Sequence, residues 1–273
     1  MKPVKLILVV VGVATCSASL LAGDAPYFPR ETWKQMPDLS TNGLDVLATF
    51  NAGAVKPTRN VILADQFKYN EAVNGALTGI HLWGSWLNGV SDPGVKFSIS
   101  ILANSISSVT NNKPGAVLWT QTLSPTAVTP YATTPQQMFW NPSTGSTIAG
   151  ANTQTFQYDF VNPVNSKGVA FEQVAGTTYW LSVQASTANG QLFGWSTRDW
   201  LEGTATVPAV YGTNTTLGST RVTFKDMFYP AGVDPSLVGQ PIDLAFALDT
   251  PEPSVAAVLV VGLSALFLRR KAA

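Results

Sequence analysis

The chain has 273 residues with sixteen basic and sixteen acidic side chains, one histidine and one cysteine. Two basic residues precede residue 23 and three follow residue 268, so eleven basic residues face sixteen acidic ones in the remainder, a charge of −5. This acidic balance argues against nucleic acid and anionic lipid as partners, because both require basic patches. A single cysteine, Cys16, excludes a disulfide framework. One histidine excludes a hydrolytic zinc site of nitrogen and sulfur ligands, so we predict no metal and no cofactor.

Residues 1–22 have the layout of a secretory signal peptide. Two lysines precede an apolar run over residues 6–14, and small residues follow it. Cleavage fits after Ala18 or after Ala22, and we place the end of the signal peptide at Ala22. We therefore expect the body, residues 23–249, to be exported and to be stabilised by its core alone.

The body is poor in charge, rich in threonine, serine, asparagine, glycine and proline, and has no long stretch with apolar residues at helical spacing. Short runs of β-branched and aromatic residues between turn formers predict antiparallel strands instead. The clearest strand is residues 95–102, where Val95, Phe97, Ile99 and Ile101 alternate with polar residues. Further strands are expected at residues 77–86, 117–123, 155–160, 177–184, 192–196, 221–228 and 242–248.

At least eight strands without an internal repeat predict an all-β fold. We expect a single antiparallel β-sandwich, jelly-roll-like in form, over residues 23–249. Residues 111–115 and 125–150 read as long surface loops. Residues 24–60 fit two interpretations, either packing on the sheet or forming a mobile lead-in.

Three features follow the last predicted strand in a fixed order. Pro251, Glu252 and Pro253 come first, an uncharged run over residues 254–268 comes next, and Arg269, Arg270 and Lys271 follow. As a helix the run would rise about 22 Å, which is short for a hydrocarbon core of about 30 Å. The basic triplet marks the downstream end as cytoplasmic. A short transmembrane helix with a basic tail is therefore expected.

Together these features resemble the PEP-CTERM sorting signal of Gram-negative-type bacteria, here assigned to residues 250–273. The resemblance implies an exosortase-type membrane transpeptidase as partner. It also implies transient anchoring in the inner membrane and a final place at the cell surface or in the extracellular matrix. An ordinary C-terminal anchor with a chance Pro-Glu-Pro is the alternative.

The body carries ordered motifs that resemble a known domain. Ala64-Asp65-Gln66-Phe67 precedes a tryptophan-rich strand at residues 77–86, and Phe139-Trp140-Asn141-Pro142 and Thr178-Tyr179-Trp180-Leu181 come later. This order is similar to an uncharacterised domain of exported PEP-CTERM proteins from planctomycetes and their relatives. The resemblance covers residues 60–248 and implies a fold and an export route, but no activity.

Catalytic patterns are missing from the sequence. His81 is the sole histidine, and its place in a predicted strand favours a partly buried sheet residue over a catalytic base. A glycosidase needs only two carboxylates, and fifteen acidic residues outside the sorting motif leave that option open, yet none has a recognisable catalytic context. We predict no catalytic residue and a protein that is not an enzyme.

The eight tryptophans are the remaining functional clue. Trp140, Trp195 and Trp200, with Arg198, lie near predicted loops and could stack on sugar rings. The competing interpretation is that tryptophan fills a disulfide-free core. The leading hypothesis is a non-catalytic surface or matrix protein associated with exopolysaccharide. The alternative is a carbohydrate-binding module or weak glycoside hydrolase that acts on extracellular polysaccharide.

Overall fold

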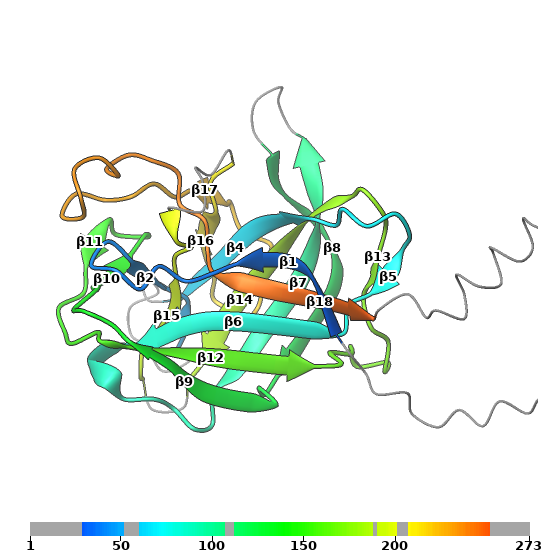
Figure 1. The fold of residues 1–273 in the computed structure, drawn as a ribbon, viewed down its shortest axis with the longest axis horizontal. Coiled ribbons are helices and arrows are strands. Elements are labelled where there is room, and N and C mark those ends of the chain that lie inside the picture. The colour runs from blue at the N-terminus through cyan, green and yellow to red at the C-terminus, as the bar shows by residue number, and fades with distance from the viewer. Residues whose placement is uncertain (1–28, 52–59, 107–111, 188–189, 201–206, 252–273) are drawn as a thin grey trace, which may run out of the picture.

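The computed structural model describes residues 29–51, 60–106, 112–187, 190–200 and 207–251 (Figure 1). The predicted signal peptide, residues 1–22, lies outside the described residues. So does the predicted sorting signal beyond Pro251. Within the described residues, no helix is long and apolar enough to cross a bilayer.

Two sheets form the layers of a β-sandwich, and we name them by their place in Figure 1. In the front sheet, β6 pairs with β12 on one side and with β18 and β15 on the other. Its nine strands are β1 (Pro29–Gln35), β2 (Leu44–Leu47), β6 (Gly79–Trp86), β9 (Ala127–Thr133), β10 (Met138–Asn141), β11 (Ser146–Thr147), β12 (Gln154–Val161), β15 (Phe193–Ser196) and β18 (Phe246–Pro251).

The rear sheet has seven strands, and its centre is β14 between β4 and β7. They are β3 (Thr49–Phe50), β4 (Val61–Lys68), β7 (Lys96–Ile106), β8 (Asn112–Leu123), β14 (Thr178–Ser186), β16 (Val210–Thr213) and β17 (Lys225–Asp226). A separate short ribbon consists of β5 (Gly75–Ala76) and β13 (Glu172–Gln173). The pairings are antiparallel except β2 with β10 and β3 with β14. The predicted all-β sandwich is therefore confirmed.

The core between the sheets is rich in aromatic side chains. Phe97 of the rear sheet packs edge-on against Phe160 and Phe193 of the front sheet. Trp86 donates its indole N–H to the Tyr158 hydroxyl at 2.6 Å, which satisfies a polar group within the core. Because each fully buried large side chain contributes about 1.5–3 kcal/mol, such a core explains how the body is stable without a disulfide.

Three loop or strand predictions are wrong in detail. Residues 221–228 form only the two-residue strand β17, because this segment folds over the outer face of the rear sheet, where Phe224 packs against the cluster around Trp180. The expected loop at residues 125–150 contains β9, β10 and β11. The prolines in this segment indicated a loop, but Pro130 lies in β9, and β9 is an edge strand, which tolerates proline. Residues 112–115, also expected as loop, belong to β8.

The ambiguous lead-in belongs to the sandwich as far as it is described. β1, β2 and β3 all pair with other strands, and Trp33 stacks on Phe246 in the core region. Residues 24–28 and 52–59 lie outside the described residues. The first of these interpretations, packing on the sheet, is therefore correct for residues 29–51.

Candidate functional site

The first and last described residues meet at one end of the sandwich. Pro29 opens β1 and pairs with Pro251, which closes β18. The ribbon of β5 and β13 lies at the same end, on the right in Figure 1. The backbone N–H of Thr78 donates to Asp249 O, which attaches the segment before β6 to the end of β18. We call this end the tail-exit pole and define it by residues 29–31, 69–78, 161–177 and 249–251.

The predicted sorting motif begins inside the folded body. Pro251 is the last residue of β18, whereas Glu252, Pro253 and the basic residues Arg269, Arg270 and Lys271 lie outside the described residues. β18 is held on both sides, by six residue pairs with β1 and four with β6. The motif therefore begins at the last residue of a strand that is paired on both sides, and no linker separates the strand from the motif.

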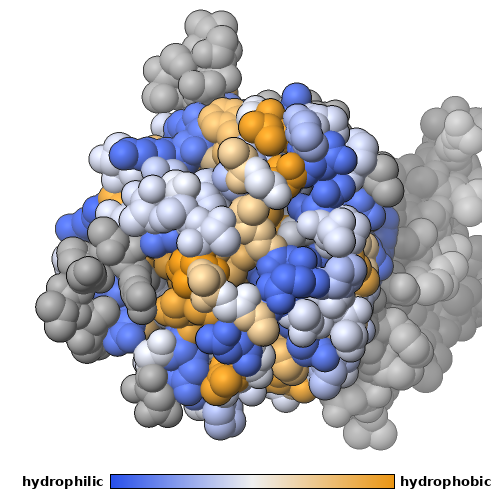
Figure 2. Space-filling view, turned by 90° about the vertical axis from the view of Figure 1, so that its left-hand side faces the viewer, coloured by the Kyte–Doolittle hydropathy of each residue, from blue (hydrophilic) through white to orange (hydrophobic). Residues whose placement is uncertain are grey.

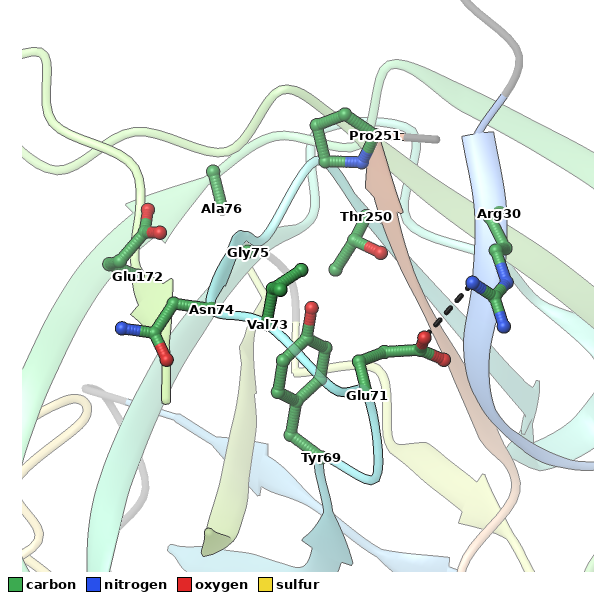
Figure 3. A pocket seen from close by; sticks show the side chains of 10 residues that line it. All are labelled: Arg30, Tyr69, Glu71, Val73, Asn74, Gly75, Ala76, Glu172, Thr250 and Pro251. Atoms are coloured by element: carbon green, nitrogen blue, oxygen red, sulfur yellow. Dashed lines mark ion pairs between the residues drawn. The ribbon is translucent and has the colours of Figure 1, made fainter. Parts of the chain in front are cut away.

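A pocket of about 300 Å³ opens beside Pro251 (Figure 3). Arg30 and Glu71 form an ion pair at 2.9 Å on one side, and Glu172 and Asn74 lie on the other. Tyr69 rises between them, and its approach requires Gly75, because an added Cβ there would overlap the tyrosine hydroxyl. Burial raises the pKa of Tyr69, so its hydroxyl stays neutral in the pocket.

His81 lies on the outer face of the front sheet between two carboxylates. Its Nδ1 lies 2.6 Å from Asp159 Oδ1 and its Nε2 lies 2.8 Å from Asp249 Oδ2. The register explains this geometry, because Asp159 is directly opposite His81 on β12 and Asp249 is opposite Gly79 on β18. We call these three residues the outer cluster. They join three neighbouring strands.

The outer cluster fixes the protonation of His81. Its hydrogen bond with Asp249, and then that with Asp159, raise the pKa of His81 to about 9, and burial opposes them only partly. The ring is therefore protonated at pH 7, and both nitrogens donate to carboxylates. A general base must be able to accept a proton near neutral pH, and His81 cannot do so here.

A second cluster lies inside the sandwich, and we call Asp65, Asp243 and Arg198 the inner cluster. Asp65 accepts the backbone N–H of Gln66 and that of Leu244, each at 2.7 Å. Because Asp65 is on β4 and Leu244 leads into β18, this carboxylate joins the two sheets. Arg198 pairs with Asp243 at 3.2 Å.

Burial dominates the ionisation of the inner cluster. It raises the pKa of Asp243 to about 6, although the Arg198 guanidinium lowers it. Burial, followed by the nearby charge of Asp243, raises the pKa of Asp65 well above its usual range. Among the described residues, no three histidine, cysteine or acidic side chains are arranged to hold a metal ion.

The predicted glycan platform is wrong for two of its tryptophans. Trp195 is 0% exposed, and its indole N–H donates to Ala245 O at 2.7 Å. Trp140 is also buried, because its side chain belongs to the hydrophobic core. A ring enclosed in this way has no face for a sugar. Arg198 belongs to the inner cluster, and Trp200 alone of the four has a well exposed side chain, at 41%.

Sequence reasoning missed the partners of His81 and the pocket at Pro251. Asp159 lies in a strand that was predicted, and alternation places it on the same face as Gln157, which donates to it at 2.7 Å. What the sequence could not supply was the order of the strands, so nothing indicated that β12 and β18 flank β6. Glu71 lies in a loop and Glu172 in the two-residue strand β13, and neither has a distinguishing pattern in the sequence.

The fold and these sites define an all-β sandwich in which the first and last described residues, Pro29 and Pro251, meet at one pole. Residues 31–249 match the family described as a domain of unknown function, DUF7901, and the chain belongs to that family. No curated protein and no solved structure matches the chain.

Proposed function

We propose that this chain is a non-catalytic exported protein of the cell surface or extracellular matrix of a Gram-negative-type bacterium. A PEP-CTERM signal at residues 250–273 is read by an exosortase-type transpeptidase, and a signal peptide at residues 1–22 directs export. The apolar run at residues 254–268 is a short transmembrane helix that anchors the chain transiently. The proposal extends to a jelly-roll-like strand order and to association with exopolysaccharide.

One observation carries the proposal: Pro251, the first residue of the motif, ends a strand that is paired on both sides. A tether that continues from β18 pulls along this strand. The load then acts in shear on the hydrogen bonds to β1 and β6 together, and the bond from His81 to Asp249 holds the same strand two residues before its end. Such an attachment suits a domain whose role is to be held at a membrane and then delivered.

The chemistry of the body supports a non-catalytic role. His81 is protonated and bonded through both nitrogens. Asp65 uses its carboxylate to bind backbone N–H groups, and Asp243 pairs with Arg198. These groups serve the fold, so none of them is available as a nucleophile or base.

Cell fractionation tests the proposal. The full chain is expressed in a host that carries an exosortase, next to a matched chain that lacks residues 254–268. We expect the full chain in the envelope or outside the cell as a shortened product, and the deleted chain as an unsorted periplasmic protein. Retention of the full chain in the cytoplasm would refute export, and identical fates of the two chains would refute sorting.

The alternative, a carbohydrate-binding module or weak glycoside hydrolase, retains one favourable observation. Trp200 is exposed and follows Arg198 by two residues, so it offers a ring to a sugar. Glycan-array binding by the folded protein that is lost in Trp200→Ala would support this alternative. Trp33→Ala, which changes a half-buried tryptophan of β1, is the matched control.

A further inference from the structure

The tail-exit pole carries a group of exposed valines. Fifteen large hydrophobic side chains are exposed among the described residues, and five of them, all valine, lie at this pole. Val73 is the most exposed of the five, at 62%. The group consists of Val73, Val161, Val164, Val169 and Val174, and we call it the valine surface.

Backbone hydrogen bonds hold the two segments of the valine surface side by side. β13 pairs with β5, the N–H of Leu77 donates to Phe171 O at 2.8 Å, and the N–H of Asn162 donates to Thr78 O at 2.7 Å. These contacts join residues 69–78 to residues 161–177. Val73 and Pro251 line the same pocket, so the valine surface borders the point where the chain leaves the sandwich (Figure 3).

The sequence after Pro251 limits how far this surface can be from a membrane. Only Glu252 and Pro253 separate Pro251 from the apolar run that begins at Ser254. Three residue steps span at most about 11 Å, and the head-group layer of a bilayer is itself about 6 Å thick on each side. A body tethered through this run must therefore have its tail-exit pole at the lipid head groups.

Charge at the pole indicates which lipids it can meet. Arg30 is paired with Glu71, Glu31 with Lys34, and Asp249 with the protonated His81, which leaves Lys167 and Glu172 as the exposed ions beside them. These charges nearly cancel, so anionic lipid offers little attraction. Contact must come from the valines and from the high effective concentration that a short tether creates.

We propose that the valine surface rests on the neutral head-group region of the membrane to which the chain is tethered. This inference rests on the tether of the proposed function. The contact is weak without the tether, so cleavage near the sorting motif also frees the pole from the bilayer. The peptide link between the body and the apolar run then controls both the docking of the pole and its release.

The opposite pole provides the matched control. Figure 2 shows apolar side chains gathered on that face as well, and the loop between β17 and β18, which contains Val238, lies there. Val238 is 44% exposed and Val174 is 48% exposed, so the two differ little in local exposure. They differ in their distance from the tether, which is the variable that the inference concerns.

Depth-dependent fluorescence quenching tests the inference on the full chain. Single cysteines replace Val164, Val174 or Val238 in a Cys16→Ser background, and each is labelled with an environment-sensitive dye. The chains are reconstituted in phosphatidylcholine vesicles that contain lipid with a nitroxide near the head group. We expect most of the fluorescence to be lost for labels at residues 164 and 174, and none for the label at residue 238.

Flotation of the same vesicles separates the two proposals. Chains that float with the vesicles but show equal, low quenching at all three positions would overturn the docking and leave the tether intact. Quenching at residue 238 equal to that at residue 174 would also overturn it, since the body would then have no preferred pole. Chains that do not float would overturn the tether and the docking together. Val73→Asp in the chain labelled at residue 174 should reduce quenching while flotation persists.

Discussion

The inner and outer clusters each combine one cation with two carboxylates, yet they ionise in opposite ways. In the inner cluster, burial raises the pKa of Asp243 to about 6 and raises that of Asp65 as well. In the outer cluster, the pKa that changes is that of the cationic residue, because hydrogen bonds to two carboxylates raise the pKa of His81 to about 9. The difference shows that desolvation dominates the pKa of the two aspartates of the inner cluster, whereas direct hydrogen bonds dominate that of the histidine of the outer cluster.

Both clusters act on the same strand. The inner cluster binds the segment that leads into β18, through Leu244 N–H, and the outer cluster binds β18 itself, through Asp249. The strand that ends at Pro251 is thus fixed at its beginning and near its end. This gives the acidic groups of the body a structural role in holding the strand from which the proposed tether extends.

Asp65→Ala should produce the largest effect. It leaves the N–H groups of Gln66 and Leu244 without the Asp65 acceptor, and each buried donor that is left unsatisfied costs about 1–3 kcal/mol. Urea unfolding measures this loss of stability. Asp65→Asn retains one acceptor oxygen and should lose less. A loss below about 1 kcal/mol in Asp65→Ala would show that the sheets are not joined in this way.

Asp249→Ala should destabilise the fold by about 1–3 kcal/mol, since it removes a charged hydrogen-bond partner of His81. Asp159→Ala is the matched control in the same cluster and should cost less, because the Asp159 side chain is 19% exposed and that of Asp249 is 6% exposed. Unfolding in urea at pH 7 compares the two. The reverse order would contradict the role of Asp249 in holding β18.

The outer cluster should make stability depend on alkaline pH. The pKa of His81 is about 9 in the folded chain and 6.5 in a model peptide, so its contribution is complete below pH 6.5 and is lost as pH rises through about 9. Unfolding free energy should therefore fall between about pH 7 and pH 10. His81→Gln should flatten this dependence. An equal slope in both chains would mean that another group causes it.

Gly79→Ala should have the smallest effect, and it acts on the pKa of His81. An added Cβ would overlap Asp249 Oδ2 and displace the carboxylate from the ring. NMR titration of His81 should then give a pKa lower by about half a unit to one unit. Gly94→Ala, where an added Cβ would meet its nearest atom, Asp92 Oδ1, at 3.4 Å, is the control. An unchanged pKa of His81 in Gly79→Ala would show that Asp249 does not raise the pKa of the histidine.

The sequence predicted those features that depend on neighbouring residues. Val95, Phe97, Ile99 and Ile101 all face the core, as their alternation indicated. Ser98 and Ser100, on the opposite face, are buried too: Gly218, in the segment after β16, lies against Ser98, and the Ser100 hydroxyl bonds with that of Thr120 on β8. Whether a loop covers the second face of a strand depends on tertiary packing, which alternation cannot reveal.

The candidate sites were less predictable because their residues are distant in sequence. His81 is separated from Asp159 by 78 positions and from Asp249 by 168. A contiguous motif such as Pro251-Glu252-Pro253 needs no strand order to be recognised, whereas a cluster across three strands does. For the same reason Trp195 was placed near a loop by its neighbours, although β15 is an internal strand of the front sheet.

Intact-mass measurement of the native protein, recovered from cells or medium, tests most directly whether the chain is exported and then processed at the sorting signal that follows β18. We predict a chain that begins after the signal peptide and ends between Pro251 and Ser254, with or without an adduct at that end. A mass that includes every residue through Ala273 would contradict processing and leave an ordinary membrane anchor.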